Sequence, residues 1–266
     1  MPLKCITCLC ILENLSDIDA QYSQKITHAY ARSTTQNFIY QWSQFIEFCG
    51  KHNLQLYPPV PYNVARFITM YSDKVSSFNT VNNMVSSLKT FYKLSGFELN
   101  VQSPVIDLLL RSCRRTMSSQ SKPKNPIEIG HLLLIKNFVD FSNPPEFAFF
   151  TALLVQFFGC LRISNLLPVS AAQLDSVQYL RRSNVTISQG NLLLSLHWSK
   201  TLQNSDKIFV IPIAGCSGSI LDPVGHYASF ALAFPVPISS PSFSYIINGT
   251  LHVLTRTQYI SYLKKF

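Results

Sequence analysis

Residues 157–170 read FFGCLRISNLLPVS and place one arginine, Arg162, between two apolar clusters. An amphipathic helix carries its charges on the solvent face, so an arginine with apolar neighbours on both sides needs an explanation. Two interpretations stay open for this stretch. Arg162 either lays its methylene stem along apolar surface with its guanidinium in water, or serves as a binding or catalytic cation.

The composition predicts a folded chain with a polyanionic partner. Its 266 residues leave room for two ordinary domains, and 47% of them are hydrophobic against 13% charged, a balance typical of globular proteins rather than disordered chains. Lys and Arg together number 22 against 13 acidic residues, and the pI is near 9.2. A basic chain of this kind is expected to bind a polyanion, and nucleic acid is the first candidate.

The first half of the chain predicts a helical bundle. Apolar residues recur three and four positions apart, the spacing of an amphipathic helix, in four runs: 38–49, 62–75, 79–97 and 103–117. Thr34 or Thr35 is expected to cap the first helix, and Gly96 to end the third. We therefore expect a helical domain over 25–118, preceded by a poorly ordered segment, 1–24.

A cationic segment follows the last of these runs. RSCRRTMSSQSKPKNP, residues 111–126, contains no acidic residue. Its cations are Arg111, Arg114, Arg115, Lys122 and Lys124. A solvated helix end that runs into a Ser/Pro tether has this composition, and so does a strap that contacts DNA phosphates. The two interpretations are compatible, so we expect a linker at 119–126 and DNA contacts from these five residues.

The second half combines helices with strands. A long apolar helix is expected over 144–167, and two β-rich runs, 191–200 and 207–213, enclose the polar turn TLQNSD, which predicts a hairpin. Asp222 and Pro223 predict the start of another helix. The expected fold class is mainly α with a small antiparallel β-sheet.

Other features argue against membrane, secreted and metal-binding classes. No run of about 18 uncharged apolar residues occurs, and the N-terminal segment lacks the small-residue cleavage pattern of a signal peptide. The seven cysteines are scattered and odd in number, as expected for reduced thiols. CITCLC, residues 5–10, has no second cysteine pair to complete a four-ligand zinc site. We expect an intracellular protein with no membrane span, metal or other cofactor.

Together these segments resemble the tyrosine recombinases, the phage-integrase-like DNA strand-exchange enzymes, and within them the branch of DIRS-like and Crypton-like mobile elements. FFGCLRISNLLPV resembles the first catalytic box of that family, centred on Arg162. LHWSKTLQ resembles the hairpin that carries the catalytic lysine, here Lys200. YARSTTQNFIYQWSQFIEFC and TVNNMVSSLKTFYKLSG resemble its helical core-binding domain. The resemblance covers residues 25–266 and implies a SAM-like core-binding domain followed by a partial α+β catalytic domain over 127–266.

The resemblance implies roles for two cations in DNA cleavage. In the family a tyrosine attacks a phosphodiester to form a 3′-phosphotyrosine, and the 5′ oxygen leaves. Arg162 would clamp two non-bridging oxygens of the charged pentacoordinate state, a bidentate geometry that lysine cannot supply. Lys200 would donate a proton to the leaving oxygen, because a lysine is largely protonated at neutral pH. Lys207, at the other end of the turn, is the rival for this role.

The remaining parts of the family's site are missing from their expected places. No His-x-x-Arg box with a suitably spaced tyrosine follows the lysine hairpin. In HVLTR, residues 252–256, three residues rather than two separate the His from the Arg, and Tyr259 and Tyr262 follow too closely in the start of a final helix. Asn165 stands where many bacterial members of the family carry Glu. An asparagine at this position resembles the sequences of the mobile-element branch. We expect a C-terminally truncated, catalytically inactive chain whose long helix exposes apolar surface.

Two classes of function follow from these observations. The first is an incomplete copy of a mobile-element DNA strand-exchange enzyme. The second is a non-catalytic DNA-binding or helical protein-interaction module. Double-stranded DNA is the expected partner, a small-molecule substrate is not expected, and a homo-oligomer on DNA and a nuclear location are further expectations.

Overall fold

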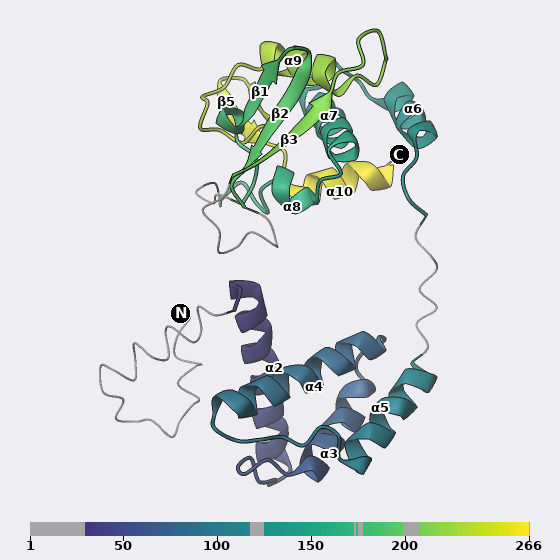
Figure 1. The fold of residues 1–266 in the computed structure, drawn as a ribbon, viewed down its shortest axis with the longest axis vertical. Helices are drawn as coiled ribbons and strands as arrows, with labels where there is room; N and C mark the ends of the chain where they lie inside the picture. Colours follow the sequence, from purple (N-terminus) through teal and green to yellow (C-terminus); the bar gives the residue numbers. More distant parts are fainter. Residues whose placement is uncertain (1–29, 118–124, 173, 175–177, 199–207, 266) are drawn as a thin grey trace, which may run out of the picture. The chain divides into compact units, whose positions relative to one another are not determined.

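The computed structural model describes residues 30–117, 125–172, 174, 178–198 and 208–265. The chain divides into two compact units, Met1–Lys124 and Asn125–Phe266, whose helices and strands are drawn in Figure 1. Each unit has its own apolar core. The described residues are mainly helical and add two small antiparallel sheets. The predicted fold class is therefore confirmed.

The described part of the first unit is a bundle of four helices. They are α2 (Arg32–Lys51), α3 (Pro61–Ser72), α4 (Phe78–Leu94) and α5 (Pro104–Thr116). Aromatic rings pack between α2 and α4. Trp42 stacks on Phe91 with ring centroids 4.0 Å apart, and its ring contacts that of Tyr92 edge-on with centroids 5.1 Å apart. The Tyr92 hydroxyl donates to the carbonyl of Leu56, 2.9 Å away. The Tyr92 hydroxyl is thereby satisfied, whereas Nε1 of Trp42 is buried without a hydrogen-bond partner among the described residues.

Two helix ends were predicted for this unit: the N-cap of α2 is wrong, and the end of α4 at Gly96 is confirmed. The structure starts α2 at Arg32, and the amides of Thr34 and Thr35 donate to the carbonyl of Ala31 at 2.8 and 3.0 Å. The prediction that either threonine caps this helix is therefore wrong, because both lie inside the first turn. Gly96 follows the end of α4 with a φ of 80°, in the left-handed region that favours glycine.

The second unit combines five helices with five strands in its described residues. The helices are α6 (Ile129–Phe138), α7 (Pro144–Phe158), α8 (Ile163–Leu166), α9 (Pro223–Ala233) and α10 (Arg256–Lys265). The strands are β1 (Val185–Ser188), β2 (Asn191–Leu196), β3 (Phe209–Ala214), β4 (Ser244–Ile247) and β5 (Thr250–Val253). A short 3-10 turn, η2 (Arg182–Asn184), precedes β1.

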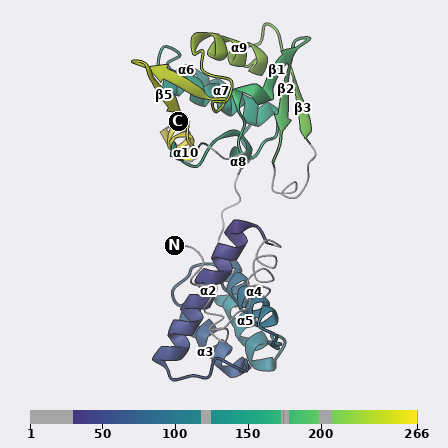
Figure 2. The same ribbon diagram turned by 90° about the vertical axis from the view of Figure 1, so that its left-hand side faces the viewer.

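The central helix α7 organises the second unit. It contacts α8, α9, α10 and β4, and Figure 2 shows it between α6 and the sheet of β1, β2 and β3. That sheet is antiparallel with β2 in the middle. Alternate residues of β2 are buried: Leu192, Leu194 and Leu196. The predicted pairing of the two β-rich runs is confirmed, whereas β1 was not predicted.

The long apolar helix is shorter than predicted. It ends at Phe158, and Gly159 is its C-terminal cap. Cys160 then adopts a φ of 49°, which turns the chain out of the helix before Arg162. The predicted exposure of this helix is also wrong, because residues 148–155 are all buried and the ring of Tyr259 on α10 lies 5.2 Å from that of Phe149.

Polar contacts fix the start of α9. The carboxylate of Asp222 accepts hydrogen bonds from the amides of Val224 and Gly225, each at 3.1 Å. This is an N-cap that satisfies two of the unpaired amides of the first turn. The predicted helix start is therefore confirmed.

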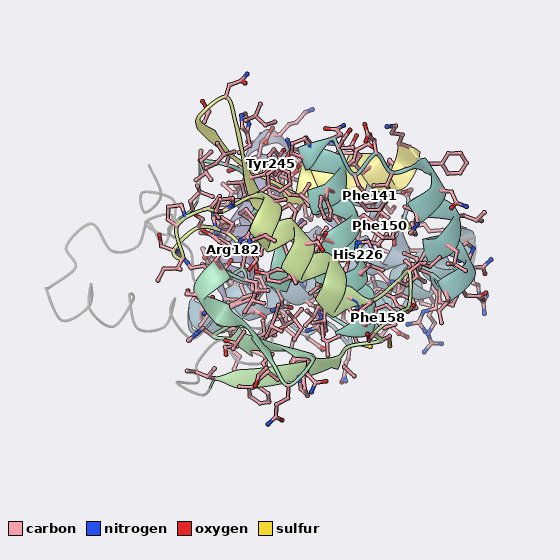
Figure 3. All side chains as sticks on the ribbon, turned by 90° about the horizontal axis from the view of Figure 1, so that it is seen from above. Phe141, Phe150, Phe158, Arg182, His226 and Tyr245 are labelled. Carbon is pink, nitrogen blue, oxygen red and sulfur yellow. The ribbon has the colours of Figure 1, made fainter. Side chains whose placement is uncertain are left out.

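Two basic side chains of the second unit, Arg182 and His226, are half-buried (Figure 3). Arg182 donates to the carbonyls of Phe234 and Ser244, each at 3.2 Å, and so ties η2 to the end of α9 and to β4. His226 on α9 lies among aromatic rings, 5.6 Å from Phe141 and 5.3 Å from Phe150. Burial lowers the pKa of both basic groups.

Among the described residues, no helix is both long enough and apolar enough to cross a membrane. The same residues contain no group of three or more His, Cys, Asp or Glu side chains placed to hold a metal ion.

Candidate functional site

Arg162 stands at the head of a short turn on the surface of the second unit. Its backbone is extended, with φ −72° and ψ 141°, and it occupies the N-cap position of α8. Its side chain is exposed, and within the described parts of the chain it makes no hydrogen bond or ion pair. The guanidinium is therefore free to bind an anion from solvent, as a clamp on a phosphate requires.

The residues before Arg162 are anchored from the interior. Gln156 donates from Nε2 to the carbonyl of Leu161 at 3.2 Å, and its backbone carbonyl accepts from the amide of Leu161 at 3.0 Å. The buried hydroxyl of Tyr259 donates in turn to Oε1 of Gln156. A chain of hydrogen bonds thus runs from α10 through α7 to the residue next to Arg162.

The residues after Arg162 are held by a second arginine. Arg256, the first residue of α10, donates from Nε to the carbonyl of Leu167 at 2.9 Å and from one terminal nitrogen to that of Ser164 at 3.2 Å. Its amide donates to the carbonyl of Pro168 at 3.0 Å. These contacts engage Nε and one terminal nitrogen of the guanidinium with backbone carbonyls, so Arg256 supports the Arg162 turn.

His252, Tyr259 and Tyr262 all pack against other aromatic rings of the second unit. His252 lies on β5 and stacks on Tyr245, with ring centroids 5.8 Å apart and planes at 8°. Tyr259 is only 1% exposed, and burial raises its pKa. Tyr262 stacks on Phe149 at 5.2 Å, and burial is the main reason that its pKa is raised. A phenol whose ionisation is disfavoured by burial is a poor nucleophile.

A buried amide links the Arg162 turn to the β2–β3 hairpin. Asn165, 4% exposed, donates from Nδ2 to the carbonyl of Trp198 at 2.9 Å. The backbone carbonyl of Asn165 accepts a hydrogen bond from the backbone amide of Leu180 at 2.9 Å. Trp198 follows the last residue of β2 by two positions, so Asn165 fixes the base of the hairpin against the turn that starts with Arg162.

The predicted lysines lie within this hairpin connection. The last paired residues of β2 and β3 are Leu196 and Phe209, so residues 197–208 join the two strands. Lys200 and its rival Lys207 both fall in this segment, outside the described residues. The topology therefore starts the lysine-bearing connection beside the Arg162 turn.

The predicted DNA-binding arginines lie at the C-terminal end of α5 in the first unit and are exposed. Arg111 forms an ion pair with Asp107 at 2.8 Å, so its charge is partly neutralised by a carboxylate just outside the acid-free segment. The guanidinium of Arg114 lies 4.9 Å from the ring centroid of Phe78, the first residue of α4. Arg115 makes no ion pair within the described residues. Lys122 and Lys124 fall outside them.

The structure also reveals a polar face of α4 that sequence reasoning did not single out. Its exposed polar residues, which we call the α4 polar face, are Asn79, Asn82, Asn83, Ser86, Lys89 and Lys93. The helix contains no acidic residue. The signal was present in the sequence, because these positions are the complement of the apolar stripe that predicted the helix.

A comparison with known proteins gives a partial match to an integrase/recombinase XerD homologue of Selenomonas ruminantium. The two chains are 23% identical over 133 residues, which cover 48% of this chain and 38% of the relative. The match thus spans less than half of the relative's length. No protein-family model matches the chain. The similarity supports a relationship to tyrosine recombinases and does not test the DIRS-like or Crypton-like branch.

Proposed function

We propose that this chain binds duplex DNA with the architecture of a tyrosine recombinase and does not itself cleave the strand. The observation that carries this proposal is that Arg162, exposed and without an ion pair or hydrogen bond among the described residues, lies on a turn that Asn165 ties to the base of the β2–β3 hairpin. A planar cation and a lysine are parts needed to neutralise a phosphodiester in the family's reaction, and the sequence of the hairpin connection contains Lys200 and Lys207. The partial similarity to an integrase/recombinase supports the same conclusion.

The proposed roles follow the chemistry of phosphoryl transfer. Arg162 would donate two parallel hydrogen bonds to the non-bridging oxygens of one DNA phosphate. Lys200 would donate a proton to the 5′ oxygen as its bond to phosphorus breaks. Asn165 would hold the hairpin base at the distance that these two contacts require. The Asn at this position is also the feature that favours the mobile-element branch.

The surroundings of Tyr259 and Arg256 support the proposed lack of cleavage. Strand cleavage needs a tyrosine hydroxyl that reaches phosphorus and a set of cations that act together. Tyr259 is buried and bonded to Gln156, and Arg256 is bound to backbone carbonyls. Tyr259 would have to leave the core before it could attack phosphorus, and Arg256 would have to give up its bonds to the backbone before it could clamp a phosphate with both of these nitrogens. These contacts support DNA binding without strand cleavage as the proposed function.

The first test measures the salt dependence of binding. Replacing Arg114, Arg115, Lys122 and Lys124 with Ala should weaken binding to a duplex and flatten the plot of log affinity against log salt by roughly 0.9 for each lost phosphate contact. The control is Lys264→Ala, an exposed cation of the second unit. A slope that equals that of the control would place the phosphate contacts elsewhere. No salt-sensitive binding at all would favour the helical protein-interaction module instead.

The second test separates a binding module from an enzyme. The chain is incubated with nicked suicide duplexes that carry candidate element ends and is then examined by denaturing electrophoresis. We expect no covalent band of protein and DNA. A band that appears with the natural chain and disappears in Tyr259→Phe or Tyr262→Phe would refute the proposed lack of cleavage.

A further inference from the structure

The α4 polar face carries a row of free carboxamides. Asn79, Asn82 and Asn83 are all exposed, and residues three and four apart on a helix lie side by side. Within the described residues, none of the three carboxamides makes a hydrogen bond. Each therefore presents an unused donor and an unused acceptor to solvent.

The hydroxyl groups of the same helix behave differently. Ser86 donates from its hydroxyl to the carbonyl of Asn82 at 2.9 Å, and Thr90 donates to that of Ser86 at 2.9 Å. These side chains turn back onto the helix and are satisfied there. The asparagines are thus the uncharged polar groups of this face that remain available to a partner.

Asparagine is a costly choice for the exposed positions of a helix. It forms helices less well than Ala, Lys, Glu or Gln, because its carboxamide competes for backbone groups in non-helical conformations. A face that only needed to be solvated would favour the better helix formers. Three asparagines without any local hydrogen bond break this rule with no visible gain in stability, which is typical of a functional surface.

The chemistry of the row fits the edge of adenine. A carboxamide donates and accepts side by side, and in the DNA major groove adenine offers the matching acceptor N7 and donor N6 amine. With a rise of about 1.5 Å per residue, Asn79 to Asn83 extends about 6 Å along the helix axis. Since base pairs lie about 3.4 Å apart, the row matches two neighbouring base pairs.

Cations flank the row at both ends. Arg114 reaches the first residue of α4 through its contact with Phe78. Lys89 and Lys93 are exposed farther along the same face and make no ion pair within the described residues. Asn79 and Lys89 are about 15 Å apart along the axis at 1.5 Å per residue, comparable to the groove width of about 12 Å. Because Arg114 contacts Phe78, the residue next to Asn79, cations lie near both ends of this span and can contact the phosphates on either side of a groove.

We propose that the α4 polar face reads adenine bases in the major groove of duplex DNA through Asn79, Asn82 and Asn83. Arg114, Lys89 and Lys93 bind the flanking phosphates. This inference rests on the proposed duplex binding and adds to it a class of target: sites with neighbouring A·T pairs.

The test selects duplexes from a library with a randomised core, using the full chain. The natural chain should enrich cores that contain neighbouring A·T pairs. The double variant Asn82→Ala and Asn83→Ala should lose this enrichment and bind the enriched duplex at least about tenfold more weakly. Its affinity for a G·C duplex and its salt slope should stay unchanged, because no phosphate contact is removed. Lys89→Ala with Lys93→Ala should instead weaken binding to every duplex and flatten the slope.

The matched control is Asn137→Ala, which makes the same change at an exposed position of α6 in the second unit. Because Ala favours a helix over Asn, neither variant should lower the thermal midpoint. Duplex binding without A·T enrichment, or enrichment that survives in the double variant, would overturn the base-reading proposal alone. No salt-sensitive binding to any duplex would overturn the proposed function on which it rests.

Discussion

Replacing Arg256 with Met should loosen the turn that presents Arg162. The change keeps much of the apolar stem and removes the two side-chain hydrogen bonds to the carbonyls of Leu167 and Ser164, 2.9 and 3.2 Å long. A hydrogen bond from a charged donor contributes roughly 1.5–3 kcal/mol. Arg256 is only partly buried, so water replaces part of this, and we expect a loss of about 2 kcal/mol for the pair.

Amide hydrogen exchange followed by mass spectrometry measures this loss where it occurs. The amides of Asn165 and Leu167 donate to the carbonyls of Arg162 and Ile163, at 2.8 and 3.0 Å, so their exchange reports opening of the turn. A loss of about 2 kcal/mol corresponds to exchange roughly 30 times faster, since about 1.4 kcal/mol is a factor of ten. Amides of the first unit should exchange at their natural rates.

The control for this experiment is Lys264→Met, which removes an exposed cation from the same helix. Equal exchange at Asn165 and Leu167 in the two variants would show that the bonds from Arg256 do not hold the turn. Faster exchange spread evenly over β1, β2 and β3 would also refute the reasoning, because the effect would then be a general loss of stability in the second unit.

Three further perturbations test the interior of the second unit. Burial lowers the pKa of His226 below its ordinary value of about 6.5, so the unfolded chain binds the proton more readily than the folded chain does. The stability of the second unit should therefore be full above about pH 6.5 and fall below it. His226→Gln should reduce this difference between urea titrations at pH about 7.5 and about 5.5. Asp222→Ala removes the N-cap of α9 and should cost about 1–2 kcal/mol in urea unfolding, whereas Ser229→Ala, at an exposed position of the same helix, should cost nothing measurable. Tyr259→Phe removes the hydroxyl that donates to Gln156 and should lower the free energy of unfolding by about 1 kcal/mol; no change would mean that water satisfies Gln156 equally well.

Local sequence patterns were sufficient for most elements of the fold. The stripe of apolar residues in α3, α4 and α5, the Asp-Pro start of α9 and the two runs of the hairpin all depend on residues a few positions apart. The short strand β1 was missed because its residues are mostly exposed, which leaves no buried stripe to detect. The end of α7 was also missed, since Cys160 gives no sign by its residue type that it adopts a positive φ.

The sequence by itself determined which residue is the candidate phosphate clamp, because the apolar setting of Arg162 and its resemblance to a catalytic box are local features. Tertiary structure decided the roles of the residues around it. Arg256 and Leu167 are 89 positions apart, Tyr259 and Gln156 are 103 apart, and Asn165 reaches Trp198 across 33. Whether an arginine is free or bound to carbonyls, and whether a tyrosine is buried or presented, depends on which distant groups the packed core brings within hydrogen-bonding distance.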